Sequence, residues 1–197
     1  MTSTQKTLND MPVILFKRQK DWAAWLDKNH VKSSGIWLRL AKKTSDLKSV
    51  SYAEAVEAAL CYGWIDGQAK SWDESSWVQK FSPRGPRSIW SKINRAKAEE
   101  LIKSGRMKPA GLQAIEQAKK SGQWGAAYDS HRTATVPDDF QTALDKNAQA
   151  QAFFNTLDSG NRYAILFRLQ TAKKAETRAR RIEQFIRMLE KKEKLYP

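Results

Sequence analysis

A carboxylate stands among aromatic and glycine residues in the run Gly-Trp-Ile-Asp-Gly-Gln at positions 63–68. Asp66 could anchor a cationic group, or act as a general base if burial raised its pKa. Gln68 could orient polar groups of the same ligand, and Trp64 could supply an aromatic wall. The alternative is that Asp66 bonds nearby backbone in a tight turn. The run therefore indicates either a ligand-facing carboxylate or a turn.

Positive charge and aromatic rings come together a few residues later. Arginines on the Pro/Gly-rich loop at 82–87 could hold a carboxylate or a phosphate bidentately, and a tryptophan could stack on the ligand. Single-stranded nucleic acid suits the same pattern, because its bases stack on aromatic rings. The alternative is a solvated basic surface whose aromatic residues, Trp64 among them, pack in the core. The candidate residues of this set are Arg84, Arg87, Trp90, Lys92 and Asn94.

Established catalytic and cofactor motifs are absent from the sequence. It contains no phosphate-cradling Gly-Lys-Ser/Thr loop, no Gly-x-Ser-x-Gly, no His-Glu-x-x-His and no dinucleotide fingerprint. Cys61 is the only cysteine, and His30 and His131 are the only histidines, so a Cys/His zinc site is strongly disfavoured, and no spacing argues for the alternative, a carboxylate-rich metal site. We therefore assign no catalytic residue, no metal ligand and no cofactor.

The charge of the chain is strongly positive and unevenly distributed. The net charge is +14, and residues 80–108 carry nine basic side chains against two acidic ones. A clustered positive field attracts polyanions such as nucleic acid, anionic lipid or phosphorylated ligands. The alternative is a basic surface whose only role is to keep the protein soluble.

Length and composition are those of a folded protein of one or two domains. The 197 residues are 41% hydrophobic and 28% charged, and no apolar run approaches the roughly 18 residues of a membrane span. The polar N-terminus lacks the apolar core of a signal peptide. A single cysteine agrees with a reducing compartment, so we expect a cytoplasmic protein.

Helices and strands alternate in the first part of the chain. Residues 1–11 are expected to form a flexible polar arm. Short apolar runs predict strands at 13–16 and 36–41, and apolar spacing predicts a helix at 21–29. Ser51 and Glu54 form a capping-box pattern that starts a helix ending near Gly63. Alternating runs over 64–81, with the turn at 73–75, predict a β-hairpin in which Gly67 marks a bulge or a close backbone approach.

The second part of the chain is predicted to be helical throughout. Helices are expected over 91–103 and from Pro109 to about Gly122, and a polar linker follows at 125–136. Four further helices are expected at about 138–146, 148–157, 160–170 and 173–193. The predicted fold class is α+β: a small antiparallel or mixed sheet with a β-hairpin and packed helices at 12–124, then an all-α domain at 137–197.

Three motifs make the chain resemble the bacteriocin-protection, YdeI/OmpD-associated family. They are EAVEAALCYGWIDGQ (54–68), QKFSPRGPRSIWSKIN (79–94) and LIKSGRMKPAGLQAI (101–115). The segment 137–194, which contains Glu-Thr-Arg-Ala-Arg-Arg-Ile at 176–182, looks like that family's C-terminal helical region. Together these segments extend the resemblance over nearly the whole chain after the arm.

The resemblance implies a bacterial cytoplasmic protein with an α+β part followed by a helical part. It also implies a role in stress, in protection against bacteriocins and cationic antimicrobial peptides, and a link to an outer-membrane porin. It supplies no catalytic residues. The candidate site therefore rests on the residue patterns alone.

Three hypotheses follow, in order of preference. The first is a non-enzymatic resistance protein that binds a small anionic ligand or a protein partner at the surface formed by residues 64–94. The second is a nucleic-acid-binding protein that uses the basic face of residues 80–108. The third is an enzyme with Asp66 as its general base. Nothing in the sequence sets the oligomeric state.

Overall fold

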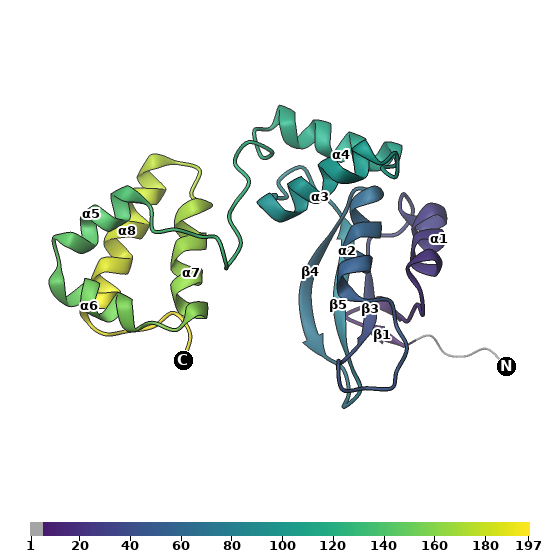
Figure 1. Ribbon diagram of the computed structural model, residues 1–197, viewed down its shortest axis with the longest axis horizontal. Helices are drawn as coiled ribbons and strands as arrows, with labels where there is room; N and C mark the ends of the chain where they lie inside the picture. The colour runs from purple at the N-terminus through teal and green to yellow at the C-terminus, as the bar shows by residue number, and fades with distance from the viewer. Residues whose placement is uncertain (1–5) are drawn as a thin grey trace. The chain divides into compact units, whose positions relative to one another are not determined.

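The structure is a computed structural model that describes residues 6–197. The chain packs into two compact units, each with its own core (Figure 1). Unit 1 takes the chain up to Ile89 together with Asn94–Gly125, and unit 2 takes Trp90–Ile93 together with Ala126–Pro197. None of the helices in the described part has the length and apolar character needed to span a membrane.

Unit 1 is built on a five-stranded mixed sheet. Its strands are β1 (Thr7–Leu8), β2 (Met11–Ile14), β3 (Ile36–Ala41), β4 (Trp64–Ser71) and β5 (Ser76–Pro83), in the order β1-β2-β3-β5-β4. Only β2 and β3 are parallel; the other neighbours are antiparallel. The sheet confirms the predicted fold class for this part of the chain.

The N-terminal strands differ from the expectation. Thr7 pairs with Pro12 and Leu8 with Met11, so the arm expected at 1–11 is strand from Thr7 onward; residues 1–5 lie outside the described part. The strand expected at 13–16 instead ends at Ile14. The hairpin of β1 and β2 was missed because its turn, at Asn9 and Asp10, uses two positive-φ residues in a polar stretch.

Helices α1 (Gln19–Asn29) and α2 (Tyr52–Cys61) cover one face of the sheet, together with α4 (Pro109–Lys120) packed on α2; α3 (Lys92–Lys103) precedes α4. On that face Ile36 pairs with Phe81 and both are buried, and Trp22 of α1 lies 5.7 Å from the Phe81 ring. Both bonds of the predicted capping box form, between Ser51 and Glu54. The side chains of β3 and β5 on this face thus form a core between the sheet and the helices, although Trp37 and Val78, which point to the other face, are buried as well.

Glycines fix how α2 ends and how α4 approaches it. Gly63 has a φ of +69°, and a Cβ there would lie 2.8 Å from the Ala110 carbonyl oxygen. Gly111, inside α4, faces the end of α2 so closely that a Cβ would lie 2.5 Å from the Cys61 oxygen. Only glycine allows both the left-handed turn and the contact between the backbones.

The predicted β-hairpin is confirmed in β4 and β5. Asp66 pairs with Phe81 and Ala69 with Gln79, so two residues of β4 oppose Lys80 alone, and Gly67 lies in the expected bulge. The loop expected from Ser82 starts later than predicted, because Ser82 and Pro83 still pair with β4. Pro83 is tolerated since it is the last residue of β5 and lies beyond the last pair with β3.

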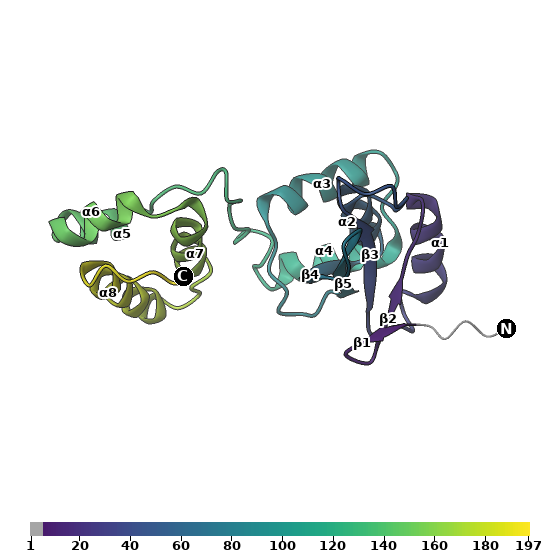
Figure 2. The same cartoon turned by 90° about the horizontal axis from the view of Figure 1, so that it is seen from below.

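Unit 2 contains α5 (Asp138–Asp145), α6 (Ala148–Thr156), α7 (Ser159–Gln170) and α8 (Ala175–Glu190), which surround a core of aromatic and aliphatic side chains (Figures 1 and 2). Phe140 and Phe154 meet edge to face at 5.5 Å. Arg178 of α8 donates to both carboxylate oxygens of Asp139 on α5, at 2.5 and 2.8 Å, and to the Leu169 carbonyl at the end of α7. The all-α C-terminal region is therefore confirmed.

Gly111→Ala tests the close approach of α4 to α2. Alanine normally stabilises a helix interior, but here its Cβ would lie 2.3 Å from the Met107 sulfur and 2.8 Å from the Leu60 oxygen. We expect the free energy of unfolding to fall by about 1–3 kcal/mol, measured by urea denaturation with tryptophan fluorescence.

Gly85→Ala is the matched control, because the nearest atom to a Cβ at Gly85 is 4.0 Å away. It should change the stability by less than about 0.5 kcal/mol. A stabilising effect of Gly111→Ala would contradict the described packing of α4 on α2.

Candidate functional site

Trp64, the first candidate residue, belongs to the core of unit 1. Its side chain is 1% exposed, and its ring meets those of Trp22 and Trp25 edge to face at 6.1 and 5.8 Å. The indole Nε1 donates to the His30 carbonyl oxygen at 3.2 Å. The core alternative therefore holds for Trp64, whose ring offers no open face to a ligand in this structure.

Asp66 and Gln68 lie close together on β4, at and beside the bulge. The Tyr52 hydroxyl, at the start of α2, donates to Asp66 Oδ2 at 2.6 Å. Asp66 is half-buried and Gln68 is exposed, while the Gln79 side chain donates to the Gly67 carbonyl at 2.8 Å. The partner that sequence analysis missed is Tyr52, which is brought to Asp66 by the packing of α2 and not by proximity in the chain.

The loop after β5 holds its two arginines differently. Arg84 Nη1 donates to the Ile89 carbonyl oxygen at 3.3 Å, and its Nε and Nη2 atoms are buried. Arg87 is exposed. The Arg84 guanidinium is therefore partly buried and bonded to its own loop, whereas Arg87 is the more exposed of the two.

Trp90 and Lys92 belong to unit 2, whereas Asn94 belongs to unit 1. The segment that contains Trp90 pairs through its backbone with Tyr128, and Trp90 is 2% exposed. Lys92 forms an ion pair with Asp129 at 2.8 Å. The eight candidate residues are thus divided between the two units, and the single surface predicted over residues 64–94 stays a prediction.

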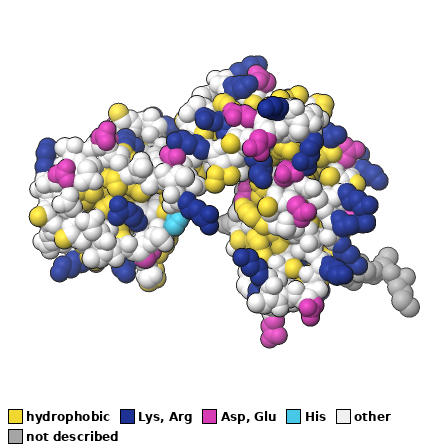
Figure 3. Space-filling model, viewed as in Figure 1, with side chains coloured by type: hydrophobic (Ala, Val, Ile, Leu, Met, Phe, Trp, Pro, Cys, Tyr) yellow, Lys and Arg dark blue, Asp and Glu magenta, His cyan; other side chains and the backbone are white. Residues whose placement is uncertain are grey.

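The basic residues of the segment 80–108 are largely engaged in contacts of their own. Besides Lys92, Arg95 donates to the Trp124 carbonyl oxygen at 3.3 Å. Lys97 and Arg106 both lie within ion-pair distance of Glu57. In the face of unit 1 seen in Figure 3, Lys and Arg side chains alternate with Asp and Glu and do not form one continuous patch.

A hollow of about 400 Å³, which we call the basic pocket, opens within unit 1. It lies between α1, the end of α2 and the segment that joins α3 to α4. We call its more buried apolar residues, Ala23, Ala58 and Cys61, the floor, and its exposed cations, Lys20, Arg106 and Lys108, the rim. The lining residues are Gln19, Lys20, Ala23, Ala58, Cys61, Tyr62, Gly105, Arg106 and Lys108.

Backbone bonds at the end of α2 and in the segment before α4 hold the rim of the basic pocket. The Lys108 amide donates to the Cys61 carbonyl oxygen at 3.1 Å, and the Arg106 amide donates to that of Leu101 at 3.0 Å. Gly105 has a φ of +68°, which turns the chain after α3. Two cationic side chains are therefore held beside the end of α2.

Glu57 links three elements at the edge of the basic pocket. Its Oε1 accepts from Gln19 Nε2 at 3.1 Å and from Arg106 Nη2 at 2.5 Å, and Lys97 Nζ lies 3.9 Å from Oε2. Burial raises the pKa of Glu57, but the hydrogen bonds from Gln19 and Arg106 outweigh it and lower the pKa below its ordinary value. Glu57 is therefore ionised at neutral pH and fixes Arg106 in place.

Cys61 and Tyr62 remain protonated at neutral pH. Burial raises the pKa of the Cys61 thiol, although the positive charges of Arg106 and Lys108 act in the opposite direction. Burial and the hydrogen bond to Asp27 raise the pKa of Tyr62 to about 12. Cys61 therefore serves as a small apolar group in the pocket and not as an activated nucleophile.

No sequence motif points directly to the basic pocket. Its lining residues come from three segments, at 19–23, 58–62 and 105–108, that carry no shared motif. The nearest indication in the sequence is the pair of cationic residues, Arg106 and Lys108, that precede Pro109 at the start of α4. The pocket contains none of the eight predicted site residues.

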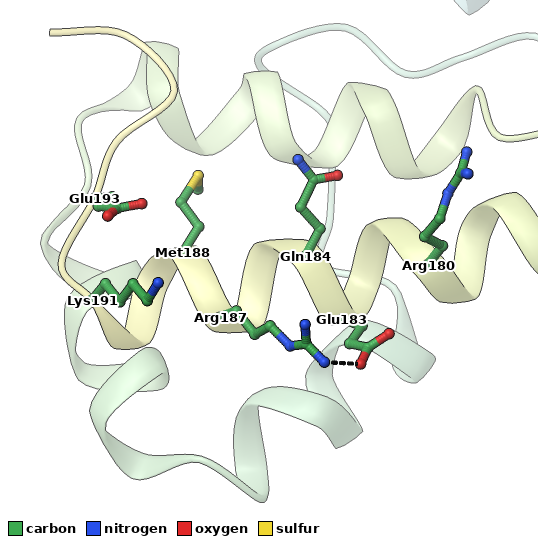
Figure 4. Close-up of a pocket in the computed structure, with 7 residues that line it drawn as sticks. All are labelled: Arg180, Glu183, Gln184, Arg187, Met188, Lys191 and Glu193. Atoms are coloured by element: carbon green, nitrogen blue, oxygen red, sulfur yellow. Dashed lines mark hydrogen bonds and ion pairs between the residues drawn. The ribbon is translucent and has the colours of Figure 1, made fainter.

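A second hollow lies in unit 2 along α8. Figure 4 shows Arg180, Gln184 and Met188 along one side of this helix, with Glu183 paired to Arg187 beside them. Three cations and two carboxylates line this hollow, so its charge is nearly balanced. Within residues 6–197, no group of three His, Cys, Asp or Glu side chains is arranged to hold a metal ion.

Comparison with known families divides the chain in two. Residues 14–114, just over half of the chain, match the domain of unknown function DUF8412. The chain therefore belongs to that family. Residues 133–192 match the family described as Bacteriocin-protection, YdeI or OmpD-Associated.

The second match confirms the resemblance for the C-terminal part alone. The motifs at 54–68, 79–94 and 101–115, on which the wider resemblance relied, lie in or next to the DUF8412 region. No curated protein and no solved structure shows detectable similarity to the chain.

The turn between β4 and β5, which contains Asp73, allows a prediction of how the stability of the hairpin depends on pH. The Ser76 hydroxyl donates to Asp73 Oδ1 at 2.6 Å and, with Ser75 and Arg39, lowers the pKa of Asp73 from 3.8 to about 2. Because the folded pKa lies below the unfolded value, these bonds stabilise the hairpin above pH 3.8. Their contribution is lost as the pH falls through about 2.

An NMR titration of the Asp73 carboxyl should therefore show a midpoint of about 2. Ser76→Ala should raise that midpoint toward 3.8, because it removes the largest cause of the shift. Ser75→Ala, which removes a weaker bond, should raise it less. A wild-type midpoint at 3.8 would contradict the described turn.

Proposed function

We propose that the protein protects bacterial cells against bacteriocins, and that it does so by binding a small anionic ligand or a protein partner and not by catalysis. The observation that carries this proposal is the match of residues 133–192 to the bacteriocin-protection family. Those residues include all four helices of unit 2 and its core. The expected location is the bacterial cytoplasm.

The side-chain chemistry of unit 1 supports binding over catalysis. Asp66, the one candidate general base, accepts a hydrogen bond from the exposed Tyr52 hydroxyl and lies on a strand next to a bulge. Cys61 is a thiol kept protonated by burial. A positively charged hollow with an apolar floor suits recognition of an anion better than activation of a nucleophile.

A survival assay tests the protective role. Cells that lack the gene should be killed by a bacteriocin that cells expressing the chain survive. Phe185→Ala should abolish protection, because removal of a ring 2% exposed in the core of unit 2 costs about 3–5 kcal/mol.

Lys173→Ala, an exposed change outside the core, should protect as well as the wild type. The intact mass of a bacteriocin incubated with purified protein should not change. Equal killing of both strains by every bacteriocin in a broad panel would refute the protective role, and a cleaved or modified bacteriocin would refute its non-enzymatic nature.

Nucleic-acid binding is the second candidate function, favoured by the nine basic residues against two acidic ones in the segment 80–108. Its affinity would fall steeply with salt, with a slope that reports the number of phosphates neutralised. Because many of these cations already have partners, we expect oligonucleotides to show no micromolar binding at about 0.15 M salt.

Fluorescence titration with short DNA and RNA at two salt concentrations measures this. Arg87, which is exposed on its loop, supplies the variant. Micromolar binding that weakens with salt, and whose slope falls by roughly 1 in Arg87→Ala, would favour nucleic acid over the first proposal.

A further inference from the structure

The cations around the basic pocket outnumber the carboxylates. Lys20, Arg106 and Lys108 line it and Lys97 lies behind Glu57, whereas the carboxylates bonded to its walls are Glu57 and Asp27. In and next to the pocket lining, four positive charges thus stand against two negative ones. A phosphate monoester carries about −1.5 to −2 charges at pH 7, so its charge matches this excess.

Donors remain for such a ligand. Glu57 accepts from Nη2 of Arg106, and a guanidinium group has five N–H donors in all. Lys20 and Lys108 are exposed, and neither forms an ion pair with any residue in the range 6–197. A phosphate between these three side chains would receive charge-assisted hydrogen bonds from two directions, from α1 and from the segment before α4.

The floor of the pocket suits a carbon skeleton. Ala23 of α1 and Ala58 and Cys61 of α2 present small apolar groups beneath the cationic rim. The volume of about 400 Å³ lies in the usual range of small-molecule sites. Inorganic phosphate would leave this apolar floor unfilled, so the pocket favours an anion that carries an apolar body.

We propose that the basic pocket binds a small organic phosphate, with the phosphate group between Lys20, Arg106 and Lys108 and the carbon body against Ala23, Ala58 and Cys61. The phosphate could belong to a soluble ester or to a lipid head group. This inference deepens the proposed function and rests on it only for the role of the ligand in protection.

Phenyl phosphate is the test ligand, titrated by calorimetry against the purified full chain. The double variant Lys20→Gln/Lys108→Gln should bind it more weakly by roughly tenfold for each lysine lost. Lys103→Gln, an exposed change at the end of α3 and outside the pocket, should bind it as the wild type does. Inorganic phosphate and phenol should each bind more weakly than phenyl phosphate.

Cys61 reports where the ligand binds. It is the only cysteine and is 6% exposed, so at an alkaline pH, where part of the thiol is ionised, the rate of its alkylation by iodoacetamide follows access to the pocket floor. Saturating phenyl phosphate should slow that alkylation in the wild type but not in the double variant. Circular dichroism checks that the double variant is folded.

Vesicles separate the two sources of phosphate. A lipid head group would be the ligand if the protein floats with phosphatidic acid vesicles but not with phosphatidylcholine vesicles, and if the double variant no longer floats. Phenyl phosphate binding without flotation would assign it to a soluble ester. Failure of every probe to bind, equal affinity in all variants, or unchanged Cys61 alkylation would overturn the inference.

The survival assay distinguishes failure of this inference from failure of the proposed function. If the double variant loses phenyl phosphate binding but still protects cells, the pocket stands and its part in protection fails. If the wild type binds phenyl phosphate but protects no cells, the proposed function fails and the pocket stands.

Discussion

The close contact of α4 with the end of α2 is the constraint on which the rest of unit 1 depends. Gly111 lets the two backbones meet, and the Lys108 amide satisfies the Cys61 carbonyl. Gly63 then turns the chain, and its carbonyl accepts from the Arg84 amide, which closes the far end of the β4–β5 hairpin. One helix end therefore sets the start of β4, the position of the basic pocket and the entry of the loop after β5.

Local patterns predicted the elements of the fold. β3 was predicted at its observed bounds because its apolar residues lie between clear breaks in the sequence. The capping box and the positive-φ glycines placed the ends of the helices, since a cap or a left-handed turn restricts residue type strongly. The bulge at Gly67 was one of the two predicted alternatives, because a glycine inside a strand often marks a bulge or a close backbone approach.

The tertiary arrangement was not accessible in this way. The parallel pairing of β2 with β3, and the existence of β1, depend on contacts between strands that are too short to show a periodic pattern in the sequence. The density of aromatic residues and charges between Trp64 and Asn94 suggested a surface, but Trp64 packs inside unit 1 and Trp90 belongs to unit 2. Residue types identified the side chains that could take part in binding. Which of these side chains lie together is determined by the packing of the fold.

The order of the segments has a consequence for how such a chain could be assembled in evolution. Trp90–Ile93 lies well before the polar segment at 125–136, yet it counts with unit 2 through its bridge to Tyr128. A gene fusion or a recombination event placed at that polar segment would leave the N-terminal half with a short fragment, Trp90–Ile93, that belongs to unit 2. The DUF8412 and bacteriocin-protection parts of this chain are therefore not freely interchangeable modules, and a shuffled descendant would have to replace the residues around Trp90 as well.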